Sequence, residues 1–556
     1  MQTLITLAVE QKSLTFDLAD PQMTLMHRVG LAGLYMTLQQ LDRQKVNHKY
    51  NPQIPLQWEF DKRSITLHWQ GKDIDALTWL LQESFQLENG MICLRGLDAK
   101  KMPIQYLAIV HQGILGTLLQ HNSTHKKISI KTSIYYDDEE SYPLIIQYKE
   151  LKSYVYQNFA QDLCDKKTGN LSQKPISIAG WLNPGAVVRH TSFPGDTSFE
   201  EPAHLALILL FASVACCYFV LRSNLREQKA QYALVIPEIR DLEQYAKYRL
   251  TLRNKSFKEF WASSLADAGF QFLTMAEKIA QDYNIPSCQV ITMGTVAWST
   301  QQKTRTDIYF VSTDSNKGKK AVQTYKVSRE CLRDKIVGVD RREESFISPS
   351  LARELIAENL ARGKPWYTDF SSKIASGDLF EKLTYEREGL NQMIQSNKVE
   401  WNEKLKVEGK ESDRLFVEAC HEALSYTYGQ LSSRTKDDEQ IRFDKVNERF
   451  RTRLVRCKNG NNLREFIMDF WARAGRLPAV QANWEALIQL ITNDWKAARD
   501  LALLALVSYK GKENYIPISS NTIASEDSPI FDQIADVPEI SSSFSSISKL
   551  EFDEED

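Results

Sequence analysis

Seventeen consecutive apolar or small residues, Leu205 to Leu221, read LALILLFASVACCYFVL and decide what kind of fold this chain can have. The run lies at the lower edge of the length that crosses a bilayer as a helix. Arg222, Arg226 and Lys229 follow it, which favours a membrane span. The lack of a second such run and the mixed-charge segments on both sides oppose a span. We therefore expect a helix buried in a protein core, with a single-span membrane anchor as the alternative.

Around this run, the first two hundred residues mix helix-like and strand-like patterns. The sequence predicts helices over 26–41, 75–87 and 103–120, and a hairpin over 56–69 that turns at 61–63. Residues 127–135 then alternate between apolar and polar side chains, as a half-buried strand does. Regular strand–helix–strand repeats are absent, so we expect an α+β fold.

The remainder of the chain becomes progressively more helical. We expect two long helices between 237 and 285, and strands at 290–298, 308–312 and 321–327. The last two strands form a predicted hairpin, whose tip contains Lys317, Lys319 and Lys320. Such a basic tip can enter a groove of DNA and contact its backbone, with a solvated turn as the alternative. Ser348 to Ser350 predicts a helix start. The predicted domains are a large mixed α+β body over 1–365, an all-helical bundle over 366–512 and a disordered acidic tail over 513–556.

Charge is distributed unevenly along the chain. The whole sequence has a net charge of -2, but residues 517–556 contain ten acids, one base and ten serines. This segment therefore carries -9, which leaves +7 on residues 1–516. A basic body favours a polyanionic partner. The tail is predicted to be disordered, and it is either a solubilising terminus or an acidic decoy that competes with nucleic acid.

The composition is that of an ordinary globular protein, with 43% hydrophobic and 25% charged residues. These values exclude collagen-like, disulfide-scaffold and wholly disordered proteins. The eight cysteines include no Cys-x-x-Cys pair, which is typical of a reduced, cytoplasmic protein. Residues 1–9 lack a basic segment and a long apolar core, so a secretory signal is not expected.

The clearest signal for binding lies in residues 441–458. Apolar residues recur there at steps of three and four, and five bases recur beside them with the same steps. The bases are Arg442, Lys445, Arg449, Arg453 and Arg456. On a helix they fall within an arc of about 80° and along about 21 Å of the axis. Residues 441–476 contain ten bases against four acids, so this basic stripe suits successive phosphates, with a plain solvated helix face as the alternative.

Other basic or polar segments are weaker candidates. The loop after the third helix contains polar and basic residues that suit the reading of base edges beside phosphates, namely Asn122, Ser123, Thr124, Lys126 and Lys127. A plain polar turn is the alternative, and the nearby His121 and His125 lack a third metal ligand. Arg189 and His190 follow a Pro-Gly turn and suit contact with RNA or with a neighbouring subunit, with a structural turn as the alternative.

Evidence for catalysis is weak. The sequence has no phosphate-binding Gly-x-x-x-x-Gly-Lys loop, no Gly-x-Ser-x-Gly elbow, no His-Glu-x-x-His pair and no Cys/His cluster with ligand spacing. The four acids at 137–140 are typical of a solvated loop. We therefore expect a protein without catalytic activity, cofactor or bound metal, with an enzyme whose site is assembled from distant residues as the alternative.

Two stretches, Met26-His27-Arg28-Val29-Gly30-Leu31-Ala32-Gly33-Leu34 and Pro184-Gly185-Ala186-Val187-Val188-Arg189-His190, resemble those of a known family. Together with the overall layout, they are similar to the large subunit of a type I CRISPR Cascade complex. The similarity is greatest to the type I-B form of cyanobacteria and myxobacteria. It covers most of residues 1–510.

The resemblance implies a subunit of an RNA-guided complex that recognises the protospacer-adjacent motif on double-stranded DNA and supports R-loop formation. Its implied partners are the guide CRISPR RNA, target DNA, the backbone subunits, the subunit at the guide 5′ end and a small subunit. Some relatives translate that small subunit from an internal start, for which Met393 is our candidate. Others act with Tn7-like transposition proteins, so the fate of the target stays open.

Overall fold

The seventeen-residue apolar run is buried inside the protein as a helix followed by a strand. Helix α5 (Ala203–Ala215) ends at Cys216, and strand β10 (Cys217–Leu221) follows it directly. Every residue from Leu205 to Leu221 is less than a tenth exposed. The expected burial is therefore confirmed, but a single continuous helix is wrong, because the aromatic and β-branched second half favours a strand. Among the described residues, no helix has the length and apolar character that a membrane crossing requires.

The computed structural model describes fourteen segments of the chain. They are 11–47, 55–118, 132–136, 144–178, 180, 182–184, 199–221, 231–275, 280–296, 299–339, 344–402, 406–407, 409–434 and 443–511. The described helices and strands all belong to one unit, Met1–Lys510. The acidic tail lies outside the described residues.

Helix α1 (Leu25–Asn47) crosses α5 at close range because it has glycines at the crossing. A Cβ atom on Gly30 would lie 2.1 Å from the carbonyl oxygen of Ile208, and one on Gly33 would lie 1.9 Å from that of Phe211. No side chain larger than hydrogen fits between the two backbones there. The stretch from Met26 to Leu34 therefore has a packing role.

The N-terminal sheet contains the predicted hairpin. Strands β1 (Gln11–Asp17), β3 (Ser64–Gln70) and β2 (Leu56–Phe60) pair in that order and are all antiparallel. At the turn, the Asp61 carboxylate accepts hydrogen bonds from the backbone N–H groups of Arg63 and Ser64, both at 2.7 Å. The hairpin prediction is confirmed.

The next predicted helix ends earlier than expected. Helix α2 (Asp73–Ser84) gives way to strand β4 (Phe85–Glu88), which pairs with β5 (Met91–Leu94). The connection is Asn89-Gly90, and both residues have positive φ angles, 52° and 75°. Asn-Gly with positive φ is typical of a two-residue hairpin turn, and it overrides the helical periodicity of residues 85–87.

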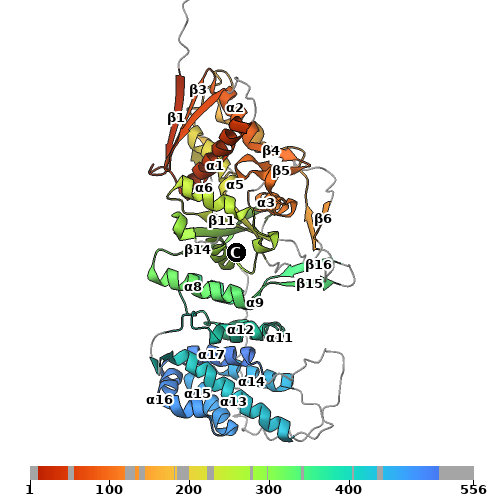
Figure 1. The fold of residues 1–556 in the computed structure, drawn as a ribbon, viewed down its shortest axis with the longest axis vertical. Coiled ribbons are helices and arrows are strands. Elements are labelled where there is room, and N and C mark those ends of the chain that lie inside the picture. Colours follow the sequence, from red (N-terminus) through yellow and green to blue (C-terminus); the bar gives the residue numbers. More distant parts are fainter. Residues whose placement is uncertain are drawn as a thin grey trace, which may run out of the picture. The chain divides into compact units, whose positions relative to one another are not determined.

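A five-stranded sheet lies at the centre of the body, between helices on its two faces (Figure 1). Its strands pair in the order β12 (Trp261–Ala262), β10, β11 (Gln231–Pro237), β13 (Ser287–Val296) and β14 (Ser299–Ser312). Helix α3 (Ile104–Thr117), as predicted, packs on β10 and β11, and α7 (Leu265–Thr274) packs on β11, β13 and β14. The two long helices expected over 237–285 are shorter, namely α6 (Leu242–Leu252) and α7.

The predicted hairpin over 308–327 is wrong. Residues 308–312 do end β14, but Lys317, Lys319 and Lys320 begin helix α8 (Asn316–Cys331), which also contains the expected strand 321–327. The hydroxyl of Ser315 caps this helix by accepting a hydrogen bond from the N–H of Gly318 at 3.0 Å. Val322 and Tyr325, three residues apart, are buried on one side of it, so the helical period prevails over the alternation.

The remaining elements of the body are helix α9, a four-stranded sheet and several short helices, strands and 3₁₀ turns. Ser350 caps α9 (Leu351–Ala361), so the helix start predicted there is confirmed. A four-stranded sheet pairs in the order β15 (Lys335–Val339), β16 (Glu344–Ser348), β7 (Leu144–Tyr148) and β6 (Thr132–Tyr136). The others are α4 (Ala160–Leu163), β8 (Ile176–Ile178), β9 (Phe199–Glu201) and the 3₁₀ turns η1 (Arg95–Leu97), η2 (Ala99–Lys101), η4 (Val155–Asn158), η5 (Phe257–Phe260) and η6 (Ala280–Tyr283).

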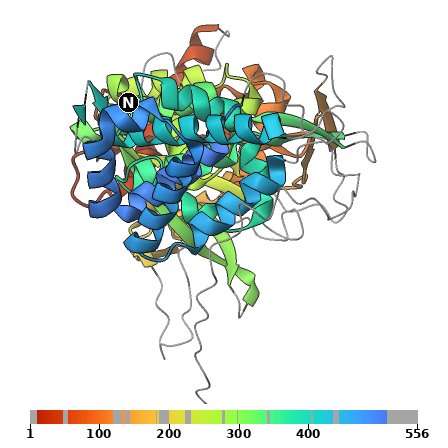
Figure 2. The same cartoon turned by 90° about the horizontal axis from the view of Figure 1, so that it is seen from below.

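Beyond residue 366 the described chain is helical, as predicted, apart from the two-residue strands β17 (Lys406–Val407) and β18 (Lys410–Glu411). Its helices are α10 (Phe370–Lys373), α11 (Gly377–Thr384), α12 (Arg387–Gln395), α13 (Ser412–Arg434), α14 (Phe443–Arg456), α15 (Gly460–Ala474), α16 (Pro478–Asn493) and α17 (Trp495–Ser508). Helix α17 contacts α10 to α16 and is the centre of this bundle, which Figure 2 shows from below.

The described residues form three hydrophobic clusters, of which the smallest lies around Met91 and Tyr148. The two larger clusters form most of the core, and α8 and α9 contribute to both. The first cluster runs from Phe16 to Ala357, and the second from Val327 to Val507. Val322 and Tyr325 of α8 belong to the first, whereas Val327 belongs to the second. The two clusters therefore share elements of the chain that lie before the domain boundary expected at residue 365.

Candidate nucleic-acid interface

Helix α14 has the buried face that its sequence predicted. Val446 and Leu454 are buried, as is Cys457 just beyond the end of the helix. Phe450 is half-buried and packs edge-on against the rings of Phe466 and Phe470 of α15, with centroids 6.3 and 5.1 Å away. Helix α14 also packs on α17, so one side of it is fixed to the bundle and the other faces outward.

The predicted basic stripe lies on the outward side of this helix. Lys445, Arg449 and Arg456 are exposed, and Arg453 is partly exposed. Successive members are three or four residues apart, so their side chains project from one face along about 16 Å of the helix axis. Arg442 lies outside the described residues. In the described part of the chain, the basic stripe therefore consists of Lys445, Arg449, Arg453 and Arg456.

Arg453 has contacts on the neighbouring helix that the sequence alone did not indicate. Its guanidinium lies over the ring of Phe466, 4.8 Å from the centroid. Its Nη2 lies 3.6 Å from Oδ2 of Asp469, and the Nε of Arg473 donates to Oδ1 of the same carboxylate at 2.7 Å. The Asp469–Arg473 pair at i and i+4 is visible in the sequence, but the approach of Arg453 from another helix is not.

Arg451 of the same helix has a structural role. It is buried, and its Nη1 donates to the backbone carbonyls of Ile374 and Ala375 at 2.9 and 2.8 Å. Its Nε donates to Glu448 at 2.7 Å, and hydrogen bonding to this carboxylate raises the pKa of Arg451. The guanidinium therefore joins α14 to the end of α10. Arg451 is thus a base of the same helix that serves the fold, in contrast to the outward-facing bases of the stripe.

The three lysines of α8 are separate from the stripe. Lys317, Lys319 and Lys320 are exposed in the first turns of α8, and Lys320 forms an ion pair with Glu400 at 3.2 Å. Helix α8 packs on α7, α9 and α12, whereas α14 packs on α15 and α17. The structure therefore places these two groups of bases on different parts of the fold and not on one continuous helix face.

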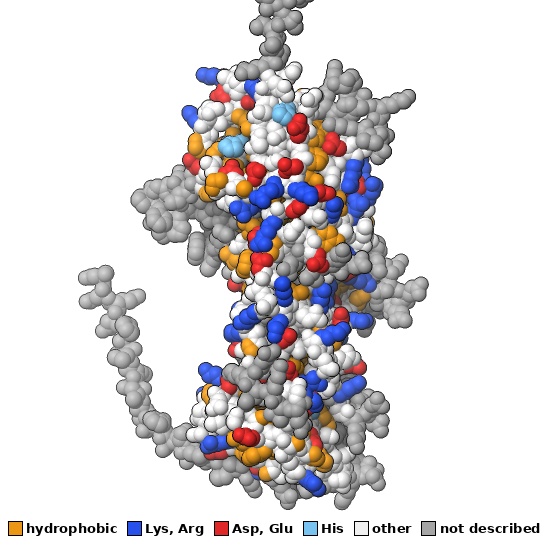
Figure 3. Space-filling model, turned by 60° about the vertical axis from the view of Figure 1, so that its left-hand side comes forward, with side chains coloured by type: hydrophobic (Ala, Val, Ile, Leu, Met, Phe, Trp, Pro, Cys, Tyr) orange, Lys and Arg blue, Asp and Glu red, His pale blue; other side chains and the backbone are white. Residues whose placement is uncertain are grey.

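Surface charge alone does not single out a binding face. In Figure 3, Lys and Arg side chains are spread among Asp and Glu side chains on the face that is drawn. What distinguishes the basic stripe from these other charges is its regular spacing along one helix that packs on α15 and α17.

Several candidate residues lie outside the described residues. They are Asn122, Ser123, Thr124, Lys126, Lys127, Arg189 and His190, together with the acidic stretch 137–140 and both loop histidines. Their roles stay predictions. Within the described segments, no group of three or more His, Cys, Asp or Glu side chains is placed to hold a metal ion.

Two surface depressions lie elsewhere on the described surface. The larger, about 460 Å³, is lined mainly by carboxamides: Gln82, Gln86, Leu87, Glu88, Gln157 and Asn158. The smaller, about 250 Å³, is lined by Met23, Leu25, Arg28, Glu238, Ser287, Cys288, Gln289 and Phe310. Neither lining includes a residue of α14, and no sequence pattern indicated either depression.

Comparison with known proteins gives two family matches and one relative. Residues 15–210 match the DevT N-terminal domain, and residues 403–538 match the DevT C-terminal domain, which includes the whole basic stripe. The chain is 27% identical over 476 residues to a protein of Myxococcus xanthus (strain DK1622) named CRISPR-associated protein Cas8a1/Csx13. The alignment covers 81% of this chain and 80% of that protein. The chain is thus similar, over most of its length, to a CRISPR-associated protein of the Cas8 type.

Proposed function

We propose that this protein is the non-catalytic large subunit of a type I CRISPR Cascade complex, and that it contacts nucleic acid through the basic stripe of α14. The observation that supports this most strongly is the position of the stripe. It lies within the residues that match the DevT C-terminal domain, in a chain similar to a Cas8-type protein. A face of spaced bases on a packed helix suits phosphate groups at successive positions.

The stripe would supply affinity without sequence preference. Bases that contact phosphates position a nucleic acid but do not distinguish its bases. In an RNA-guided complex, most discrimination comes from pairing between guide and target. We propose that this subunit recognises a protospacer-adjacent motif, through Asn122, Ser123, Thr124, Lys126 and Lys127, and that it supports R-loop formation. Lys317, Lys319 and Lys320 provide a second phosphate contact in this proposal.

The proposed partners are the guide RNA, target double-stranded DNA, the backbone subunits and the subunit at the guide 5′ end, in the cytoplasm. Arg189 and His190 are proposed to contact RNA or a neighbouring subunit. A type I-B assignment is part of this proposal. The final outcome is either destruction of the target or recruitment of a Tn7-like transposition protein.

A separate small subunit is proposed to begin at Met393 and to contain 164 residues. Met393 is fully buried in α12. A product that begins there lacks Trp366, Phe370 and Phe380, which belong to the second hydrophobic cluster. We therefore expect the fragment to need a neighbouring subunit to cover the apolar surface that these residues cover in the full chain.

The test is co-expression of the chain with the proteins that its genomic neighbours encode, followed by purification through a tag on this chain. The proposal expects a stoichiometric ribonucleoprotein that contains an RNA of guide length. A protein that purifies alone and free of RNA would contradict it. Nuclease or ATPase turnover by the purified chain would contradict the non-catalytic role.

A further inference from the structure

The carboxylate of Asp469 lies between two guanidiniums at the junction of α14 and α15. Its Oδ1 accepts a hydrogen bond from Nε of Arg473 at 2.7 Å, and its Oδ2 lies 3.6 Å from Nη2 of Arg453. One arginine belongs to the basic stripe, and the other lies on the same helix as the carboxylate. The carboxylate anion of Asp469 is therefore held between two arginines where α14 packs on α15.

All three groups can be reached from solvent. The exposed fractions of the side chains are 38% for Arg453, 32% for Asp469 and 41% for Arg473. The guanidinium of Arg453 is nevertheless positioned, because it lies over the ring of Phe466, which stacks on Phe470 with centroids 6.2 Å apart. An external ligand can approach this pair of arginines without unfolding of the helices.

We propose that Arg453 and Arg473 form a phosphodiester subsite that extends the basic stripe onto α15, and that the Asp469 carboxylate occupies this subsite in the free protein. The inference rests on the proposed nucleic-acid contact of α14. Guanidiniums bind carboxylates and phosphates through the same paired N–H donors, so the two anions compete for one place. Asp469 is then an internal competitor that weakens binding to any nucleic acid.

This arrangement has a consequence for specificity. An exposed ion pair contributes little stability, so a phosphate can displace Asp469 when the rest of the stripe is engaged. A nucleic acid that meets this subsite without the other contacts gains less binding free energy, because the Asp469 carboxylate must be displaced first. Asp469 therefore weakens the binding of non-specific nucleic acid more than it weakens the binding of a target that other contacts also hold.

The test uses the substitution Asp469→Asn in the full-length protein or its purified ribonucleoprotein. The measured quantity is the Kd for a random-sequence DNA duplex, as salt is varied between about 50 and 200 mM. We expect binding about two- to five-fold tighter than in the unsubstituted protein, and a slope of log K against log salt that is steeper by about one. The matched control is Glu485→Gln, which removes the same charge from an exposed residue of α16.

A second variant tests whether the gain depends on Arg473, whereas the control Glu485→Gln separates the subsite from a general change in charge. In the double substitution Asp469→Asn with Arg473→Gln, the gain should largely disappear, because one half of the subsite is missing. A gain that persists in the double variant, or an equal gain in Glu485→Gln, would overturn the subsite.

The outcomes also separate this inference from the proposed function. Unchanged or weaker binding by Asp469→Asn would overturn the subsite but would leave the stripe standing if the unsubstituted protein binds with a clear salt slope. No salt-dependent binding by the unsubstituted protein would overturn both.

Discussion

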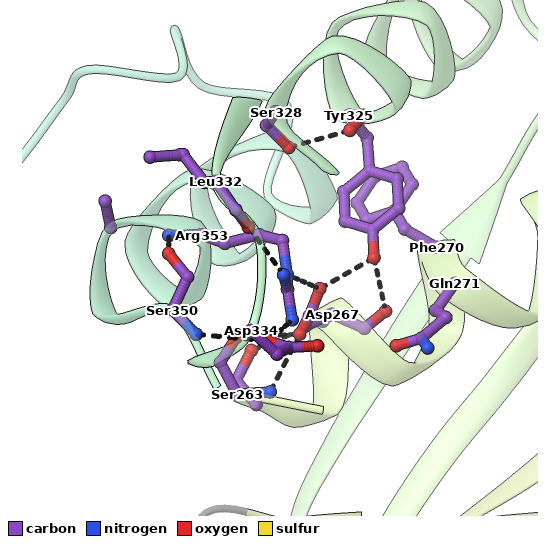
Figure 4. Close-up of polar contacts among 12 residues, drawn as sticks. Ser263, Asp267, Phe270, Gln271, Tyr325, Ser328, Leu332, Asp334, Ser350 and Arg353 are labelled. Carbon is purple, nitrogen blue, oxygen red and sulfur yellow. Dashed lines mark hydrogen bonds and ion pairs between the residues drawn. The ribbon is translucent and has the colours of Figure 1, made fainter. Parts of the chain in front are cut away.

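Arg353 of α9 and Asp267 of α7 form an ion pair that is almost completely buried, with Nε and Oδ1 2.9 Å apart and side chains 1% and 0% exposed. Figure 4 shows the groups around it. The same guanidinium donates to Asp334 at 2.6 Å and to the carbonyl of Leu332 at 2.8 Å, and the hydroxyl of Tyr325 donates to Asp267 at 2.7 Å. Burial opposes ionisation of Asp267, but Arg353 and Arg329 hold its pKa below the usual value. This pair fixes α9 to the central sheet region.

Removal of the arginine should be strongly destabilising. We expect Arg353→Met to lower the free energy of unfolding by about 3–5 kcal/mol, because Asp267 is left as a buried charge without its partner. The measurement is urea unfolding of the purified protein, followed by circular dichroism. The double variant Arg353→Met with Asp267→Asn should recover part of the loss. A loss below about 1 kcal/mol in the single variant would show that the pair does not hold the two elements together.

The helical bundle should lose stability as the pH rises. Burial raises the pKa of Asp413 to about 7, with a further contribution from the charge of Asp494. In the unfolded chain this pKa is about 4, so between pH 4 and 7 the folded state binds a proton that the unfolded state has released. Stability contributed by this group is therefore present at low pH and is lost by about pH 7.

Asp413→Asn provides the check, because asparagine stays neutral and can still accept the hydrogen bond from Tyr367. Its free energy of unfolding should exceed that of the unsubstituted protein by about 1–3 kcal/mol at pH 8, and the difference should shrink toward pH 4. The measurement is urea unfolding at several pH values. A difference that is independent of pH would show that Asp413 does not titrate in this window.

The crossing of α1 and α5 should not tolerate a methyl group. Gly33→Ala should destabilise the protein by about 1–3 kcal/mol or more, since the new Cβ meets the backbone carbonyl of Phe211. Gly429→Ala is the matched control, because Gly429 is exposed in α13 and a Cβ there meets nothing within 4 Å. That substitution should stabilise by about 0.5–1 kcal/mol. Equal melting temperatures for the two variants would contradict the close crossing.

The internal start can be tested without disturbing the core. Met393→Leu keeps an apolar side chain of similar volume at a fully buried position and should cost less than about 1.5 kcal/mol. If translation begins at Met393, the 164-residue product should disappear while the full-length chain remains. The measurement is mass spectrometry of the co-expressed complex. Persistence of the short product in Met393→Leu would rule out this start.

The sequence predicted those elements whose signal is local. The three- and four-residue spacing of apolar and basic residues over 441–458 predicted both the buried and the basic faces of α14. The burial of Leu205–Leu221 followed from its apolar composition. The α8 prediction failed because residues 321–327 fit both a period of two and a helical period, and the cap at Ser315 decided between them. The end of α2 was missed because the Asn89-Gly90 turn was not recognised.

Contacts between distant residues lay beyond sequence reasoning. Nothing in the sequence indicates that Asp469 meets Arg453, or that Arg353 meets Asp267, 86 residues away. The roles of the glycines at 30 and 33 likewise depend on a partner helix almost two hundred residues later. Such pairs are set by how the elements pack, which a single sequence does not encode locally.

Binding of nucleic acid by the basic stripe of α14 can be tested through the salt dependence of DNA binding by the double variant Arg449→Glu with Arg453→Glu. Arg451→Gln is the control, since that base has a structural role and should lower stability more than it changes the salt slope. For the double variant we expect weaker binding on every target sequence and a slope of log K against log salt that is shallower by about two. Binding and slope equal to those of the unsubstituted protein would contradict it.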